Sequence, residues 1–197
     1  MVYDAAARRA IIFGGDRNGG FNEVWALNLG DALSWQNLTP ADGPSPRWGC
    51  EAIYDPRRNR MVLFGGYSVS DINEVSYFND VWSLSLTGTP QWTRIVAQGT
   101  APSPRWEYSA VYDPDHDRML VFGGTDASYA SGVLTGILND LWSLSLDDHT
   151  WVALQPDGVI PFHRFRHVAI FDVLRSQMIV HGGESAHPFE LFHDAFA

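Results

Sequence analysis

The stretch YDPRRNRMVLFGG at residues 54–66 decides the fold, because it returns as YDPDHDRMLVFGG at residues 112–124 with eight of its thirteen residues identical. Both copies join a Tyr-Asp-Pro turn signal to an apolar run that ends on a diglycine. Weaker copies of this run are IIFGG at 11–15 and MIVHGG at 178–183. Counted at the second glycine, successive diglycines lie 51, 58 and 59 residues apart. Self-similarity at such a period predicts a repeat architecture.

Other signals keep the same register. Pro-Ser-Pro-Arg-Trp precedes the two strong copies, and NDVWSLSL or NDLWSLSL follows them. A short segment around Trp35, Trp92 or Trp151 closes each full unit. The apolar runs are too short for helices and are rich in Val, Ile, Phe and Trp, which favours buried strands. Each unit therefore predicts four strands, a to d, and in the second unit these cover residues 47–54, 60–64, 81–86 and 91–96.

These motifs resemble the kelch family of β-propellers, and the resemblance covers nearly the whole chain. Its carriers are the diglycine after strand b, the Asn-Asp-x-Trp at strand c and the Trp of strand d. The resemblance implies an all-β fold of four-stranded antiparallel blades. The wording Pro-x-x-Arg-Trp and Tyr-Asp-Pro is similar to the repeats of large bacterial secreted proteins. It implies an extracellular or periplasmic location for the full-length protein, although residues 1–10 contain no signal-peptide core.

The repeat count predicts one domain of about three and a half blades. Met1 aligns with the middle of strand a, and residues 193–196 align with the start of strand c. We therefore expect a fragment of a larger ring, forming an open arc. The expected blades cover residues 1–39, 47–96, 105–154 and, incompletely, 164–197.

Composition narrows the function. The net charge of −10 repels phosphate backbones and so argues against nucleic-acid binding. The sequence contains no run of 18 apolar residues, so no membrane-spanning segment is predicted. The single cysteine, Cys50, excludes an internal disulfide and is expected to be a small core residue. The five histidines between His163 and His193 have no fixed metal-ligand spacing, so we predict neither a metal site nor a cofactor.

Two sets of residues have structural explanations. The Trp residues of strands c and d are expected to fill the wedges between blades, because each ring buries a large apolar area. The aspartates that end strand a are expected to bond backbone N–H groups of the a–b turn. They are Asp4, Asp55, Asp113 and Asp172, and an arginine lies five residues after the first three.

The candidate binding residues lie around the b–c loops, 67–78 and 125–138, because variable loops on a rigid scaffold tend to carry recognition residues. They are Tyr67, Asp71, Asn73, Tyr77, Asp126 and Tyr129. The kelch resemblance places strand a innermost, so Arg47, Arg105 and Arg164 would surround one channel mouth. These arginines suggest an anion-accepting ring, since guanidinium has a planar fork of donors. The alternative is that each pairs with a carboxylate of the next blade or stacks on an aromatic ring.

We therefore predict a non-catalytic binding or scaffolding module for a protein or carbohydrate ligand, with self-association through open propeller edges. The alternative is part of a galactose-oxidase-like or sugar-processing enzyme whose active site lies in other blades. The resemblance implies that such an oxidase would need a copper site with a Tyr-Cys cross-link. Nucleophile and metal signatures such as Gly-x-Ser-x-Gly and His-Glu-x-x-His are absent from this sequence.

Overall fold

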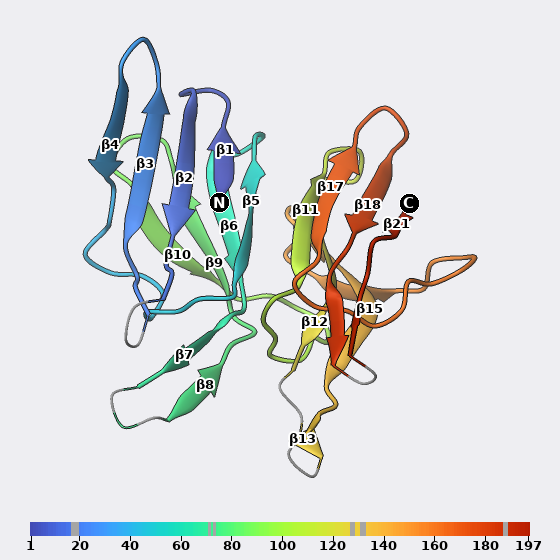
Figure 1. Ribbon diagram of the computed structural model, residues 1–197. Coiled ribbons are helices and arrows are strands. Elements are labelled where there is room, and N and C mark those ends of the chain that lie inside the picture. Colours follow the sequence, from blue (N-terminus) through green and yellow to red (C-terminus); the bar gives the residue numbers. More distant parts are fainter. Residues whose placement is uncertain (17–19, 71, 73, 127–128, 131–132, 187–188) are drawn as a thin grey trace. The chain divides into compact units, whose positions relative to one another are not determined.

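Strand pairing is antiparallel throughout the sheets of the computed structural model, and the sheets belong to two units, Met1–Ile95 and Val96–Ala197 (Figure 1). The structure describes residues 1–16, 20–70, 72, 74–126, 129–130, 133–186 and 189–197. These residues contain no helix. Accordingly, none of them belongs to a helix long and apolar enough to cross a membrane.

The first unit contains two four-stranded sheets and one small hairpin. Sheet 1 has the order β1 (Val2–Asp4), β2 (Arg9–Phe13), β3 (Val24–Leu29), β4 (Leu33–Asn37). Sheet 2 has the order β5 (Glu51–Asp55), β6 (Arg60–Phe64), β9 (Val81–Ser85), β10 (Gln91–Ile95). The hairpin of β7 (Tyr67–Val69) and β8 (Val75–Tyr77) lies between strands β6 and β9 in the chain.

The second unit repeats this plan. Sheet 3 has the order β11 (Ser109–Asp113), β12 (Arg118–Thr125), β15 (Ile137–Ser145), β16 (Trp151–Leu154). Sheet 4 has the order β17 (Val168–Asp172), β18 (Gln177–His181), β21 (Ala195–Phe196). Two hairpins complete the unit: β13 (Tyr129–Ala130) with β14 (Val133–Leu134), and β19 (Glu184–Ala186) with β20 (Phe189–Leu191). The predicted class, all-β with four-stranded antiparallel blades, is confirmed.

Strand a is shorter than predicted. In sheet 2 it begins at Glu51, four residues after Arg47, because Gly49 has a φ of 63° and interrupts the extended backbone. Trp48 pairs instead with Tyr67 of the hairpin β7–β8. Glu107 and Arg166, which precede strand a of sheets 3 and 4, take the same left-handed conformation. The segment before strand a therefore packs onto the b–c hairpin rather than extending the sheet.

The a–b turns agree with the predicted carboxylate role. In sheet 3, Asp113 Oδ1 accepts hydrogen bonds from the backbone N–H groups of Asp115 and His116 at 3.0 and 3.3 Å. The other oxygen accepts a bond from Arg118 Nε at 2.7 Å. The aspartates of the other turns likewise accept backbone N–H bonds: Asp4, Asp55 and Asp172. Each turn thus satisfies its own donors without a ligand.

The apolar core of the first unit lies between sheets 1 and 2. Val2, Ile11 and Val24 of sheet 1 are buried against Met61 and Leu84 of sheet 2. Trp92 of β10 meets Phe13 of β2 edge to face, with ring centroids 5.2 Å apart. A tryptophan of strand d therefore packs on the preceding sheet, as predicted for the wedge fillers.

Trp35 is the exception to that prediction. It occupies the same strand-d position in sheet 1, yet it is 56% exposed, and all five residues of β4 are exposed. The prediction of a packed Trp35 is wrong, because among the described residues of the first unit no sheet is stacked on the face of β4 that carries this ring.

Candidate functional site

Three buried arginines form the most regular polar feature of the molecule. Each lies just before strand a and pairs with an aspartate at the start of strand c in its own sheet. We call these pairs the Arg–Asp clamps: Arg47–Asp80, Arg105–Asp140 and Arg164–Asp194, with Nη1–Oδ1 distances of 2.5, 2.7 and 2.6 Å. The arginines are at most 1% exposed. The clamp therefore joins two parts of one sheet that are 30–35 residues apart in the chain.

In the clamp of sheet 3, all three guanidinium nitrogens of Arg105 donate hydrogen bonds. Arg105 Nη2 donates to Asp140 Oδ2 at 2.9 Å and to the hydroxyl of Ser103 at 3.2 Å. Arg105 Nη1 also donates to the carbonyl of Gly123 at 3.1 Å, and Nε donates to the carbonyl of Ser103 at 3.2 Å. The bidentate fork thus fastens the diglycine at the end of strand b to strand c.

Electrostatics agrees with this geometry. Burial alone would raise the pKa of Asp140, but the hydrogen bond and the charge of Arg105 outweigh it and hold that pKa below its usual value. Trp142 Nε1 donates a further bond to Asp140 Oδ2 at 2.6 Å. The pKa of Asp80 is lowered for the same reasons, with Arg47 as the partner. Both aspartates therefore stay ionised in neutral solution.

The arginines do not form the predicted anion-accepting ring. Their side chains have almost no exposed surface and are occupied by internal acceptors, so they cannot offer the fork to an external anion. The alternative of carboxylate pairing is the correct one, with one change: the carboxylate belongs to the same sheet rather than the next blade. Stacking also occurs, since Arg47 lies 3.8 Å from the ring centre of Phe78.

Sequence reasoning missed the aspartates, although a signal was present. Asp80 and Asp140 stand in the same place of the repeated Asn-Asp-x-Trp, and an arginine stands in a fixed place of the upstream motif. A repeated cation and a repeated anion in one register are a pairing signal. Sheet 1 carries Glu23 at this position, where it accepts a bond from Trp25 Nε1 at 2.8 Å.

The hairpin β7–β8 brings together two of the predicted binding residues. Tyr67 and Tyr77 are register partners with ring centroids 6.0 Å apart. The ring centroid of Tyr67 also lies 4.4 Å from that of Trp48. Tyr77 and Val75 are exposed. The predicted loop 67–78 is therefore partly a hairpin with an aromatic face, which holds its exposed apolar atoms in place.

The other predicted loop residues are distributed differently. Asp71 and Asn73 lie outside the described residues. Asp126 is half-buried, and its backbone N–H donates to the carbonyl of Gly136 at 2.9 Å. Tyr129 lies in β13, opposite Leu134 of β14. Of the predicted loop residues that the structure describes, Tyr67 and Tyr77 are the pair whose side chains contact each other.

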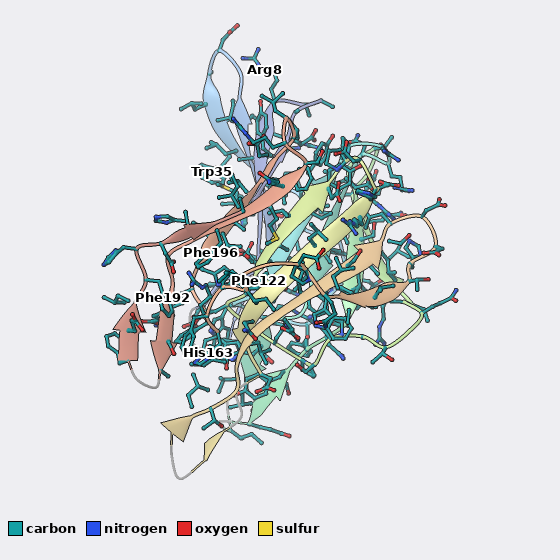
Figure 2. The ribbon with its side chains drawn as sticks, turned by 90° about the vertical axis from the view of Figure 1, so that its right-hand side faces the viewer. Arg8, Trp35, Phe122, His163, Phe192 and Phe196 are labelled. Atoms are coloured by element: carbon teal, nitrogen blue, oxygen red, sulfur yellow. The ribbon has the colours of Figure 1, made fainter. Side chains whose placement is uncertain are left out.

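A second exposed apolar group, which sequence reasoning missed, lies on the hairpin β19–β20. Phe189 is 67% exposed and Leu191 is 57% exposed. At the base of this hairpin, Phe192 packs against the exposed ring of Phe162 with ring centroids 6.1 Å apart, and the rings of Phe162 and His163 are tilted against each other with centroids 4.0 Å apart. Figure 2 labels Phe192 and His163. The signal in the sequence was the run PFELF at 188–192, which is unusually apolar for a turn segment.

Cys50 and the histidines do not form a metal centre in the part of the chain that is described. No group of three or more His, Cys, Asp or Glu side chains there could hold a metal ion. Desolvation raises the pKa of the Cys50 thiol to about 12, so the thiol stays protonated. Desolvation, aided by the charge of Arg164, lowers the pKa of His167 to about 4. The neutral His167 ring packs on Phe122 and bonds the hydroxyl of Ser109 at 2.8 Å.

The fold and the clamps define a kelch repeat protein. A family model described as the KLHDC2/KLHL20/DRC7 Kelch-repeats domain matches residues 3–196, and the chain belongs to this family. The solved structure of YjhT resembles it with a TM-score of 0.60 at 12% identity, covering 95% of this chain and 77% of that one. That likeness supports the fold.

Two curated relatives are more similar in sequence. Host cell factor 2 of Homo sapiens is 30% identical over 198 residues, covering 92% of this chain and 24% of the relative. Dynein regulatory complex subunit 7 of Chlamydomonas reinhardtii is 31% identical over 125 residues, covering 64% of this chain and 10% of the relative. The chain thus spans a quarter or less of the length of these two relatives.

Proposed function

We propose that this chain is a non-catalytic protein-binding module that contacts its partner through the b–c hairpins. The observation that carries the proposal is the exposed apolar surface of the hairpin β19–β20, where Phe189 and Leu191 lie on a two-stranded element. Apolar side chains held on a hairpin cost little ordering entropy on binding, and aromatic anchors dominate interface energetics. Membership of the kelch family is consistent with this role. The enzyme alternative gains no support from the described residues.

The proposal is tested by replacing exposed apolar residues with serine at two places, the hairpin β19–β20 and the a–b turn of sheet 4. We expect Phe189→Ser with Leu191→Ser to weaken partner binding about tenfold or more, because the anchors are removed. Val173→Ser with Leu174→Ser is the matched control, since these apolar residues, 63% and 89% exposed, lie in the a–b turn. A partner is first captured by crosslinking to the full-length protein and identified by mass spectrometry. The purified partner is then titrated against each variant by calorimetry.

The proposal fails if the hairpin variant keeps its affinity while the a–b turn variant loses it. Retention on an immobilised glycan, with no protein partner, would instead favour the carbohydrate alternative. A groove of about 220 Å³, whose lining includes Ser45, Ser68 and Ser76, is where we would then look for the sugar. Secretion of the full-length protein stays a prediction.

We also propose that two sheet faces mediate self-association. Ile170 of β17 is 63% exposed, whereas Val2, in the same position of sheet 1, is buried against sheet 2. Trp35 of β4 is exposed, whereas Trp92, its counterpart in sheet 2, packs on Phe13. The Trp35 face of one copy therefore matches the Ile170 face of another, in a head-to-tail contact.

Sedimentation over a concentration series should show oligomers that either Trp35→Lys or Ile170→Lys removes. A head-to-tail contact makes a further prediction: an equal mixture of the two variants should form dimers, because each supplies the face that the other lacks. Val96→Lys changes an exposed residue that directly follows β10 in the chain, and this variant should leave the oligomers unchanged. A wild-type chain that stays monomeric at every concentration, or a mixture that forms no dimer, rejects this contact.

A further inference from the structure

A groove of about 690 Å³ lies in the first unit, beside the edge strands β4 and β10. One wall is formed by residues 36–42, the end of β4 and the start of the segment that leads to sheet 2. The other wall is formed by residues 89–92, which lead into β10 and begin it. Both sheets beside the groove contain all four of their strands. The groove is therefore a feature of complete sheets, and its volume is within the range of ligand sites.

The wall that follows β4 is fastened to sheet 1. The backbone N–H of Leu38 donates to the carbonyl of Val24 at 2.8 Å, and the hydroxyl of Thr39 accepts a bond from the N–H of Val24 at 2.9 Å. The side chain of Asn37 accepts a further bond from the N–H of Thr39 at 2.8 Å. These bonds hold the wall to β3 rather than to β10. The groove is therefore formed before a ligand arrives, which lowers the entropy cost of binding.

The second unit closes the equivalent place with its own backbone. The N–H of Gln98 donates to the carbonyl of His149 at 2.8 Å, and the carbonyl of Gln98 accepts a bond from the N–H of Trp151 at 3.0 Å. Counted from the shared Pro-Ser-Pro-Arg and from the Trp of strand d, the counterparts of Gln98 and His149 are Pro40 and Pro90. Proline has no N–H, so Pro40 cannot donate the bond that closes the second unit.

The open groove leaves one tryptophan partly accessible. Trp151 of the closed place is 3% exposed, whereas Trp92 of the groove is half-buried. The Trp92 ring is held on two sides: Phe13 meets it edge to face, and a Cβ added at Gly43 would overlap its Cδ1 atom. The groove thus contains an indole in a fixed position, with an apolar ring and an N–H donor.

Unpaired polar side chains surround this indole. Asp42, Thr89 and Gln91 are exposed, and none of these side chains has a hydrogen-bond partner within the described parts of the chain. Gln36, on the wall from β4, is equally free there. The lining residues, all of which the structure describes, include no Lys, Arg or His. The groove therefore offers amide, hydroxyl and carboxylate groups without a cation.

We propose that this groove binds a neutral carbohydrate. Each sugar hydroxyl both donates and accepts hydrogen bonds, which matches walls that mix donors with acceptors. An anionic ligand would meet the charge of Asp42 and find no cation to pair with. A proline-rich strand would offer carbonyl acceptors but few N–H donors, so it would leave Asp42 without a partner. The proposal concerns a different surface from the hairpin β19–β20 and does not rest on protein binding there.

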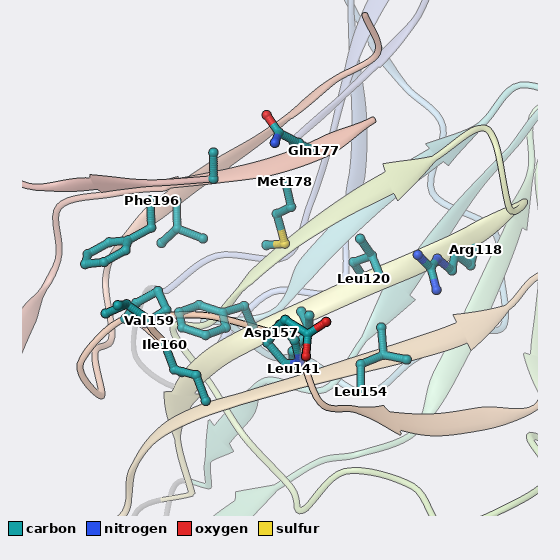
Figure 3. A pocket seen from close by; sticks show the side chains of 15 residues that line it. Arg118, Leu120, Leu141, Leu154, Asp157, Val159, Ile160, Gln177, Met178 and Phe196 are labelled. Atoms are coloured by element: carbon teal, nitrogen blue, oxygen red, sulfur yellow. The ribbon is translucent and has the colours of Figure 1, made fainter. Parts of the chain in front are cut away.

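The cavity of the second unit has the opposite chemistry. It measures about 230 Å³ and lies between sheets 3 and 4 (Figure 3). Its lining is mainly apolar and includes Leu120, Leu141 and Met178. Hydroxyl groups buried there would lose water without gaining partners, so we expect no sugar in this cavity.

The probes are cellotetraose, mannotetraose and galactotetraose, titrated against the full-length protein by calorimetry. We expect saturable binding of at least one of these neutral sugars and no binding of the acidic tetragalacturonate. Asp42→Ala with Gln91→Ala should weaken binding about tenfold or more, because hydrogen bonds to the sugar hydroxyls are lost. Ala41→Trp, which adds bulk to the wall and removes no polar group, should abolish it.

Two control variants show whether the sugar lies in this groove. Ser68→Ala with Ser76→Ala, in the groove beside the hairpin β7–β8, and Phe189→Ser with Leu191→Ser should both bind the sugar like the wild type. Loss of sugar binding in either, with the fold intact by circular dichroism, would overturn the inference. Failure of all three sugars to bind, or equal affinity of the variant that lacks Asp42 and Gln91, would overturn it as well.

A peptide probe tests the competing occupant. The peptide VAQGTAPS copies residues 96–103, the segment whose Gln98 closes the second unit. Saturable binding of this peptide, with none of the three sugars bound, would show that the groove takes an extended peptide and would reject the carbohydrate. Loss of partner binding in the hairpin variant while sugar binding persists would support two separate sites.

Discussion

Replacing Arg105 by alanine should lower the free energy of unfolding by about 3 kcal/mol or more, the cost expected when one partner of a buried ion pair is removed. The guanidinium is 1% exposed, and its loss removes bonds to the carboxylate of Asp140 and the carbonyls of Gly123 and Ser103. Asp140 is 38% exposed and can recover some hydration, which places the loss near the lower end of the range for buried pairs. Urea denaturation followed by circular dichroism measures it.

The surface pair Arg175–Asp172 is the matched control. The two side chains lie 2.7 Å apart, but Arg175 is 70% exposed, so Arg175→Ala should cost about 1 kcal/mol or less. Arg105→Lys keeps the charge but loses the bidentate fork, and we expect an intermediate loss. Equal effects of Arg105→Ala and Arg175→Ala would show that the clamp does not stabilise the sheet.

Gly66→Ala should destabilise the protein by about 2–5 kcal/mol, the sum of backbone strain and overpacking. Gly66 has a φ of 91°, and an added Cβ would lie 2.8 Å from both the Cβ of Cys50 and the carbonyl oxygen of Trp48. Those atoms belong to the segment that leads into strand a, so the glycine is required for the close approach of the b–c hairpin. Urea denaturation of the variant measures the loss.

Two glycines of the same unit separate the two causes. Gly88 has a φ of 69° but no atom within 4 Å of an added Cβ, so Gly88→Ala should show the strain alone, about 1–2 kcal/mol. Gly30 lies outside the left-handed region and also in open space, so Gly30→Ala should change stability by less than about 1 kcal/mol. If Gly66→Ala costs no more than Gly88→Ala, close packing is not the reason for the diglycine.

Local signals predicted the strands better than their ends. Strand b of the second repeat was predicted at residues 60–64, where β6 lies, because an apolar run bounded by a turn and a diglycine is a short-range pattern. Strand a was predicted four residues too early. The left-handed Gly49 and the pairing of Trp48 with Tyr67 depend on a hairpin that is distant in the sequence. The predicted loop 67–78 was partly a hairpin for the same reason.

The candidate sites were predicted less well than the fold. For Arg47 and its equivalents the sequence left two roles open, an anion-accepting ring and pairing with a carboxylate, and only their burial in ion pairs decided for the second. Tyr67 and Tyr77, chosen as binding residues of the b–c loop, lie opposite each other on one hairpin, and their role in binding stays a prediction. Phe189 and Leu191 were missed, because an apolar run in a sequence predicts burial unless the packing around it is known.

By itself, the sequence determined the repeat, the strand order within each repeat and the turns closed by Asp55 and Asp113. These features depend on residues a few positions apart, so periodicity and turn chemistry specify them. Tertiary structure alone decided which arginine meets which aspartate, that Trp35 is exposed while Trp92 is packed, and that a cavity lies beside Met178. Each of these depends on what stacks against a face or reaches across 30 or more residues, as with Arg164 and Asp194. A residue's local pattern contains no information about that neighbour, so the same Trp can be a core side chain in one sheet and a surface side chain in another.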